Sequence, residues 1–443
     1  MHTKLQKNVD FCCEKRIKFQ TFGQYQTFRK LVIQLFNHKP KMSAMGNNNR
    51  RQFLKKSIMG LSGAAFMPVS LKMRTGISAP PELPFRTLGK TGIKTPLISM
   101  GTSDTTASGF IRAAYEAGIK VFFSATYYGE GNNEKLVGEG LKGLPRDSFV
   151  VGTAVPPDGL DNRIGKFIKA FDPEAYIKKA EESLKRFGIE YVDFFLFPYA
   201  GKREMVLNDG VLKALQQLKK QGKTRFLGIA SHSDTQEALQ AAVDSGIYDL
   251  AMIGYNFKST DKATMDACIS KASEAGLGIV AMKTTAGASR AKSGPPLNTD
   301  AALKWVLQNK NISSIVSGMS SLEQLQKNLS MIQNLKMSDQ EMRDLNLANL
   351  NSEPSLYCQQ CKKCIPQCPH NLDIPTIMRS YMYAYGYKNT AQAWHTLAGV
   401  EFQNNPCGEC ASCNIKCTAG FNIKYKILDI ARLKKVPADF IQS

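Results

Sequence analysis

Long apolar runs are missing from this chain of 443 residues. None comes near the roughly 18 to 20 consecutive apolar residues that a membrane-spanning helix needs, so an integral membrane protein is not predicted. Apolar residues still make up 43% of the chain and charged residues 21%, which are ordinary values for folded proteins and exclude disorder for most of it. At about 100–200 residues per domain, the length allows two to four domains.

Acidic residues are scarce, with 37 Asp and Glu against 58 Lys and Arg, which gives a net charge of +21. The imbalance is greatest in residues 1–78, where 15 basic residues accompany only Asp10 and Glu14 and the segment carries +13. The remaining 365 residues carry only +8. The basic face that is typical of nucleic-acid-binding proteins is therefore not predicted.

Cysteine is almost absent from the first 357 residues, which contain only Cys12, Cys13 and Cys268. The other eight of the 11 cysteines lie between Cys358 and Cys417. Such a concentration predicts that the C-terminal part of the chain binds a cofactor.

A pair of arginines precedes a short apolar stretch near residue 50. The residues from Asn49 read Asn-Arg-Arg-Gln-Phe-Leu-Lys-Lys, and a modest apolar stretch from Ile58 to Leu71 follows. The pattern resembles a twin-arginine export signal and departs from it at Asn49, where Ser or Thr is usual. A basic amphipathic helix is the alternative. The resemblance implies export to the periplasm or cell envelope.

The same residues set the expected limits of this leader. We expect an unstructured extension over residues 1–45 and the signal region over residues 46–79. Met42 and Met45 both precede the arginine pair and are alternative starts of the chain. The segment 63–65, Gly-Ala-Ala, is a candidate cleavage site, and a leader that stays attached as an anchor is the alternative.

Eight short β-branched or aromatic runs follow Leu97, and amphipathic segments such as 174–187 and 209–221 separate them. This alternation predicts a (β/α)8 barrel of about 250 residues, with a doubly wound sheet as the alternative. In such a barrel the chemistry lies at the carboxyl ends of the strands. The eight predicted strands lie at 98–101, 121–123, 149–151, 192–196, 226–229, 250–253, 278–282 and 314–317.

Residues 84–337 resemble the aldo-keto reductase family along their whole length. The resemblance is carried by residues 85–92, Phe-Arg-Thr-Leu-Gly-Lys-Thr-Gly, by residues 215–223 and by residues 317–320, Ser-Gly-Met-Ser. It implies reduction of carbonyl compounds with NADPH. The family uses a Tyr as the acid, a Lys that lowers the pKa of this Tyr, an Asp paired with the Lys, and a His.

Most of this catalytic set is replaced here. Residues 118–129 match the family's second-strand motif without a gap, which puts Tyr128 on the catalytic Tyr and Phe123 on the Asp. Ala154 stands where the Lys is expected, and Phe197-Pro198 where the His closes the fourth strand. A buried Asp or Lys without its partner would be destabilising. Because Asp, Lys and His are all replaced here, no such unpaired charge remains. Conventional carbonyl reduction is therefore expected to be weak or absent.

The remaining polar residues of the barrel allow two interpretations each. Tyr128 is either a retained acid or part of the pocket wall. His232 is the only histidine in residues 84–337 and follows Ser231 at the end of the fifth strand, so it either binds a ligand or replaces an Asn of the family. An aromatic, apolar pocket mouth is expected from Phe123, Tyr127, Tyr128, Phe197 and Tyr199.

The segment 318–328 matches the family's phosphate and adenine segment, in which amides at a helix start receive phosphate. The resemblance assigns cofactor binding to Gly318, Ser320, Gln324 and Asn328. Lys327 replaces a usual Glu, so NADP is a doubtful cofactor here. A motif kept for structural reasons is the alternative, and Lys283 is a further candidate phosphate contact.

Two cysteine runs with one spacing stand in the C-terminal part. The first resembles the bacterial ferredoxin run, and the second repeats its spacing with Thr418 in place of Pro. In such runs three cysteines bind one cubane and the fourth completes the other cluster. We therefore expect two 4Fe-4S clusters, with Zn²⁺ and disulfides as the alternatives. The predicted ligand sets are Cys358, Cys361, Cys364 and Cys417 for one cluster, and Cys407, Cys410, Cys413 and Cys368 for the other.

Residues 338–356 are polar, contain Pro354, and are expected to form a linker to a small α-helical ferredoxin-like domain over residues 357–443.

The leading interpretation is an oxidoreductase in which two clusters relay electrons between an unknown redox partner and a small molecule in the barrel. One alternative is a non-catalytic binding or assembly protein with a relic barrel and structural clusters. The other is an NADPH-dependent carbonyl reductase with an altered acid.

Overall fold

A computed structural model describes residues 83–161, 166–259, 261–287, 297–350, 356–402, 406–408, 410, 413–437 and 440–441. These residues all belong to one unit, Ala79–Ser443. The predicted extension over 1–45, the export signal over 46–79, and Cys12 and Cys13 lie outside the described residues.

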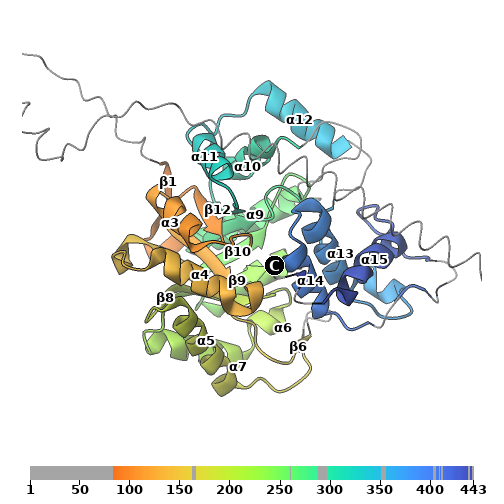
Figure 1. Ribbon diagram of the computed structural model, residues 1–443, viewed down its shortest axis with the longest axis horizontal. Coiled ribbons are helices and arrows are strands. Elements are labelled where there is room, and N and C mark those ends of the chain that lie inside the picture. Colours follow the sequence, from red (N-terminus) through yellow and green to blue (C-terminus); the bar gives the residue numbers. More distant parts are fainter. Residues whose placement is uncertain are drawn as a thin grey trace, which may run out of the picture. The chain divides into compact units, whose positions relative to one another are not determined.

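Eight parallel strands close into a barrel that is surrounded by helices (Figure 1). The last strand pairs with the first, because Ile315 lies opposite Ile98, and an open doubly wound sheet could not form this pairing. The predicted (β/α)8 barrel is therefore confirmed. The strands are β3 (Ile98–Gly101), β4 (Val121–Ala125), β5 (Val150–Ala154), β8 (Val192–Pro198), β9 (Thr224–Ser231), β10 (Leu250–Gly254), β11 (Gly278–Met282) and β12 (Ser314–Gly318).

The helices around the barrel begin and end at sequence signals. In α5, Asp172 accepts a hydrogen bond from the amide of Ala175, Pro173 occupies the first turn, and Gly188 ends the helix at a φ of 68°. The segments 174–187 and 209–221, predicted as helical, correspond to α5 and α7. The helices are α3 (Ser108–Glu116), α4 (Asn132–Leu141), α5 (Pro173–Phe187), α6 (Arg203–Val206), α7 (Asp209–Lys220), α8 (Thr235–Ser245), α9 (Lys262–Glu274), α10 (Thr299–Gln308) and α11 (Leu322–Met331).

Side chains of each barrel strand alternate between two cores, since successive residues of a strand point to opposite faces. In β8, Phe194 and Leu196 belong to the core inside the barrel. Phe195 and Phe197 belong to the core between the strands and the helices. Two short hairpins accompany the barrel: β1 (Phe85–Thr87) with β2 (Lys94–Pro96), and β6 (Leu160–Asp161) with β7 (Lys166–Phe167).

Glu134 ties three elements together below the barrel mouth. Its side chain in α4 is fully buried and pairs with Arg186 Nε of α5 at 2.6 Å. It also accepts hydrogen bonds from Thr153 Oγ1 of β5 at 2.6 Å and from Ser183 Oγ of α5 at 2.5 Å. The carboxylate therefore has a cation and two hydroxyl donors, as a buried charge requires.

The segment predicted as a linker is largely helical. Helix α12 (Asp339–Leu350) packs on α10, where Glu341 Oε1 pairs with Lys304 Nζ at 2.7 Å and Leu345 is buried. Ser338 and Glu341 form a capping box, in which the Glu341 amide donates to Ser338 Oγ at 3.2 Å and the Ser338 amide to Glu341 Oε2 at 2.8 Å. This box is visible in the sequence and explains why the polar segment folds as a helix.

The cysteine-rich part has a small core of its own, formed by residues such as Ile377, Leu397 and Ile427. Figure 1 shows its helices grouped together at the blue end of the chain. None of the described helices is long and apolar enough to cross a membrane. These helices are α13 (Ile374–Tyr381), the π-helical turn η5 (Met382–Gly386), α14 (Thr390–Ala398) and α15 (Ile423–Ala431).

Candidate functional site

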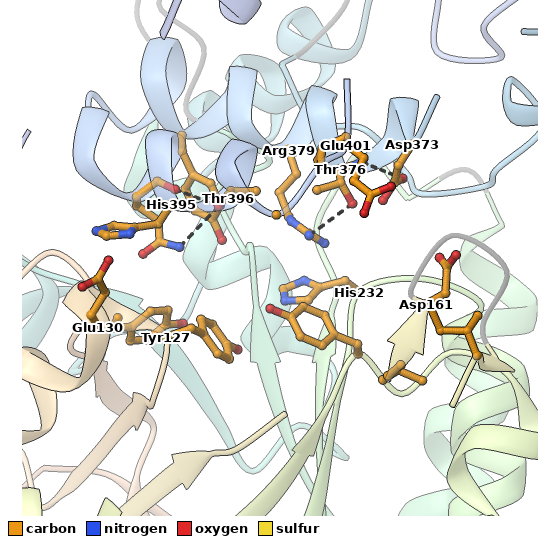
Figure 2. Close-up of a pocket in the computed structure, with 18 residues that line it drawn as sticks. Tyr127, Glu130, Asp161, His232, Asp373, Thr376, Arg379, His395, Thr396 and Glu401 are labelled. Atoms are coloured by element: carbon orange, nitrogen blue, oxygen red, sulfur yellow. Dashed lines mark hydrogen bonds between the residues drawn. The ribbon is translucent and has the colours of Figure 1, made fainter. Parts of the chain in front are cut away.

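Two cavities lie where the carboxyl ends of the barrel strands meet α13 and η5. The first, called here the mouth cavity, has a volume of about 530 Å³ and is lined by strand ends together with Tyr383 and Tyr387 of the C-terminal part. The second, the interdomain cavity, has a volume of about 430 Å³ and lies between barrel loops and helices α13 and α14 (Figure 2). The two share Tyr127, Tyr128, His232 and Tyr383 as lining residues.

Several polar contacts hold the C-terminal part over the barrel, and three of them involve side chains that follow barrel strands. Lys283 Nζ, at the end of β11, donates to Tyr383 Oη at 2.8 Å. Asn389 Nδ2 donates to Asp104 Oδ1, in the loop after β3, at 2.5 Å. Lys362 Nζ, within the first cysteine run, pairs with Asp234 Oδ2 after β9 at 3.0 Å. The contacts come from three different strand ends, so the C-terminal part covers the mouth rather than one edge of it.

Of the four positions matched to the reductase catalytic set, three lie together in the mouth cavity and one does not. Phe123, Ala154 and Tyr128 all line the mouth cavity. Phe197 does not, because it lies on the outer face of β8 and is fully buried beneath the helices. Phe123 and Ala154 have no charged groups that could act on the phenol of Tyr128. The charged groups that do act on this phenol belong to Asp104 and Arg379.

Burial controls the protonation of both candidate barrel residues. Burial raises the pKa of Tyr128 far above its usual range, and the neighbouring Tyr383, Tyr199 and Asp104 raise it further, while Arg379 opposes them. Burial also lowers the pKa of His232 well below its usual range, assisted by the charges of Arg379 and Lys283. At neutral pH the site therefore presents a neutral phenol and a neutral imidazole, which form hydrogen bonds but transfer protons poorly.

The mouth is aromatic, as expected, but it is not apolar. Tyr127 and Tyr199 stack with their ring centroids 5.7 Å apart. Four carboxylates, His395 and Arg379 also line the interdomain cavity. No sequence spacing indicated these polar groups, because most of them come from residues 373–401, which had been assigned to the cluster domain alone. The four carboxylates belong to Glu130, Asp161, Asp373 and Glu401.

The segment matched to nucleotide binding, residues 318–328, contributes to the lining of the mouth cavity. Gly318, Gln324 and Asn328 line this cavity together with Lys327 and Lys283. The amide of Ser320 donates to Gln324 Oε1 at 2.9 Å, and that of Gln324 to Ser321 Oγ at 3.2 Å, so α11 caps its own first turn. The segment can thus hold its conformation without a phosphate.

A carboxylate stands beside this segment. A Cβ placed on Gly318 would lie 2.6 Å from Asp104 Oδ2. The negative charge of Asp104 works against binding a phosphate next to Gly318. Lys283 and Lys327 are the cations of the same cavity that favour it.

The cysteines gather in two groups. Cys358, Cys361, Cys364 and Cys417 line one small cavity, although Cys417 is far from the others in sequence. Burial raises the pKa of Cys358 and of Cys364 to about 12, and their thiol neighbours add to the shift. In the second group, burial raises the pKa of Cys407 to about 11, and Cys410, Cys413 and Cys368 contribute to it.

The donor set of each group suits a cubane better than a single ion. Within the described part of the chain, no three His, Cys, Asp or Glu side chains converge closely enough to hold one metal ion. A cubane binds each thiolate at a separate iron corner, so its four ligands stand farther apart than those of a single Zn²⁺. The nine cysteines within the described ranges form no disulfide.

Comparison with known families and proteins agrees with these two parts. Residues 91–300 match the aldo/keto reductase family, and residues 357–422 match the 4Fe-4S dicluster domain. L-galactose dehydrogenase of Arabidopsis thaliana is 27% identical over 315 residues, which cover 62% of this chain and 95% of that protein. The NADH-specific methylglyoxal reductase of Escherichia coli is 24% identical over 273 residues, which cover 52% of this chain and 83% of that protein.

The fold has a solved counterpart. The aldo-keto reductase of Bacillus halodurans in its holo form superposes with a TM-score of 0.50 at 20% identity, covering 60% of this chain and 96% of its own. The chain therefore carries an aldo/keto reductase domain over residues 91–300 followed by a 4Fe-4S dicluster domain over residues 357–422, and these domains make it an oxidoreductase.

Proposed function

We propose that this protein is an iron–sulfur oxidoreductase in which two 4Fe-4S clusters exchange electrons with a small molecule held at the barrel mouth. The observation that carries the proposal is the position of α13. Ile374 and Met378, four residues apart on one face, line the cavity of the first cysteine group. Thr376 and Arg379, on the opposite face, line the interdomain cavity. A single helix, about 10–12 Å wide, thus separates the first cysteine group from the interdomain cavity, the proposed ligand site.

The proposed ligand sets follow the two cysteine groups. Cys358, Cys361, Cys364 and Cys417 would hold one cluster, and Cys407, Cys410, Cys413 and Cys368 the other. When bound, such clusters supply or accept one electron at a time. Lys362, Lys363 and Lys416 line the same small cavity as the first cysteine group. Their positive charges would favour reduction of a cluster bound there, because reduction adds a negative charge.

The barrel would bind and orient the ligand. The relatives' names include a sugar dehydrogenase and a methylglyoxal reductase, which supports a small ligand with carbonyl or hydroxyl groups. Tyr128 and His232 can hydrogen-bond such a ligand in their neutral forms and exclude water from it. Because no strand end supplies the usual ion pair, conventional carbonyl reduction would be weak.

The place of action would be the periplasm or cell envelope. The twin-arginine pattern around Arg50 and Arg51 supports this, since that route carries proteins that have already folded around their cofactors. Clusters inserted before export would then reach the envelope inside the folded protein.

The test is anaerobic purification of the full chain, followed by iron and sulfide analysis, electron spin resonance of the reduced protein, and an NADPH titration. We expect about eight irons and eight sulfides per chain. Half that iron content, or zinc in its place, contradicts the proposed clusters. Micromolar NADPH binding with rapid carbonyl reduction would instead support the nucleotide-dependent alternative.

The role of the clusters is tested with barrel variants. If the protein works as proposed, Tyr128→Phe and His232→Ala slow the reoxidation of reduced clusters by the ligand and leave the iron content unchanged. Unaltered reoxidation in both variants would favour a non-catalytic protein with structural clusters.

A further inference from the structure

Among the half-buried arginines of the described chain, Arg379 stands out because it has neither an ion pair nor a backbone carbonyl acceptor, whereas Arg86 and Arg112 donate to carbonyl oxygens. Within the described ranges the one hydrogen bond of Arg379 is weak, from Nη2 to Thr376 Oγ1 at 3.4 Å, and its guanidinium lies 5.9 Å from the ring of Tyr199. By contrast, Arg146 pairs with Asp193 at 2.8 Å and Arg186 with Glu134 at 2.6 Å. Arg379 is half-buried, and a guanidinium that is partly removed from water without a partner anion loses solvation that a ligand anion can replace.

The direction of this side chain adds a second observation. Figure 2 shows Arg379 extending from α13 into the interdomain cavity toward His232. Its charge acts on Tyr127, Tyr128, Tyr199 and His232, so it stands near all four. Burial keeps these groups neutral, and none of them supplies a countercharge.

We propose that Arg379 is the anion-binding residue of the site, and that the ligand of the barrel mouth carries a carboxylate or phosphate group. The planar guanidinium can donate two parallel hydrogen bonds to either group. An anion bound there would place the rest of the ligand against Tyr128 and His232. This inference rests on the proposed function, because it concerns the same ligand.

The carboxylates of the cavity limit what else the ligand contains. Figure 2 shows Glu130 beside His395, and Asp161, Asp373 and Glu401 toward the other side of the cavity. Asp373 caps α13, accepting a hydrogen bond from the Thr376 amide at 3.2 Å. These groups accept hydrogen bonds from hydroxyls and repel further anions. They favour a hydroxylated skeleton with one anionic group, and they disfavour a polyanion.

The experiment compares three probes of one skeleton: D-glucuronate, D-glucose 6-phosphate and D-glucose. Binding is measured by calorimetry on the oxidised, cluster-containing full chain without a reductant. We expect at least one of the anionic probes to bind about tenfold to a hundredfold more tightly than D-glucose, the range expected for a charge-assisted hydrogen-bonded pair. Arg379→Gln should abolish the difference, and Arg379→Lys should retain part of it because the charge remains.

The matched control is Arg432→Gln, which removes an exposed arginine that lines neither cavity and should leave all three affinities unchanged. Iron content and the spin resonance signal of every variant show whether the fold is intact. The inference is overturned if D-glucose binds as tightly as both anions, if no probe binds at about 10 mM, or if Arg379→Gln retains the difference. Because no electron is transferred in this assay, failure of the proposed electron exchange would leave its result unchanged.

Discussion

Phe123 and Ala154 occupy neighbouring strand ends, the positions to which the resemblance assigns the Asp and Lys of aldo/keto reductases. Both side chains belong to the apolar core inside the barrel. These two apolar side chains offer no charged partner at either strand end, so a single charge introduced at one of them would lack its counterpart.

Restoring one charge alone should therefore be costly. We expect Ala154→Lys to lower the free energy of unfolding by about 3–5 kcal/mol, because the ammonium is buried without a partner. The double variant Phe123→Asp/Ala154→Lys should regain about 1–3 kcal/mol through the new pair. Urea unfolding followed by tryptophan fluorescence measures both. Strict additivity of the two substitutions would show that these side chains do not adjoin.

His232 should make stability depend on pH. Its pKa is lowered in the folded protein, so the unfolded chain binds the proton more readily. Stability is then complete above the unfolded value of about 6.5 and falls as the pH drops below it, by at most about 1.4 kcal/mol per pH unit. Urea midpoints at pH 7.5 and 6.0 measure this. The difference between them should be smaller in His232→Gln, and an equal difference would refute the assignment.

At the scale of elements, Glu134 joins α4, β5 and α5. Arg186→Met removes its cation and leaves a buried carboxylate with hydroxyl donors alone. We expect a loss of about 3–5 kcal/mol in the free energy of unfolding. The exposed pair Lys179–Asp158 provides the control, because Lys179→Met should cost no more than about 1 kcal/mol. Similar losses in the two variants would contradict a special role for the buried pair.

The sequence predicted elements better than it predicted the contacts between them. All eight strands are found in their predicted places because each is a short β-branched or aromatic run with turns on either side. Helix α12 was missed because its exposed face is polar, although its capping box could have revealed it. The position of α13 over the barrel could not be predicted, since bonds such as Lys283–Tyr383 join residues 100 apart and leave no local pattern.

The same limit applies to the site. Spacing identified the cysteines, because cluster chemistry imposes short and regular intervals. The match to the family identified Tyr128 and His232. Arg379 gave no signal, since an arginine in an amphipathic helix is ordinary until the partner surface is known.

At the scale of the whole molecule, we expect the barrel and the dicluster domain to depend on metal to different degrees. The barrel has a large core of its own, whereas the C-terminal part has a small one next to buried thiols. Metal binding in such small domains contributes directly to folding.

Removing iron should therefore unfold only one part. We expect chelation under air to raise amide hydrogen exchange in α13, α14 and α15 by orders of magnitude, while strands β3–β12 remain protected. Mass spectrometry of exchanged peptides measures both regions in one sample. Simultaneous loss of protection in the strands would mean that the two parts unfold as one cooperative unit.

Helix α13 lines the cavity of the first cysteine group with one face and the interdomain cavity with the other, and this restricts how the chain can be recombined. A dicluster domain grafted onto a different reductase barrel would bring Arg379 without Tyr199 and His232 beneath it. Conversely, this barrel alone would lack Tyr383 and Tyr387 from the wall of its pocket. We therefore expect that the two halves are not interchangeable modules, because residues of α13 line a cavity on each side of this helix.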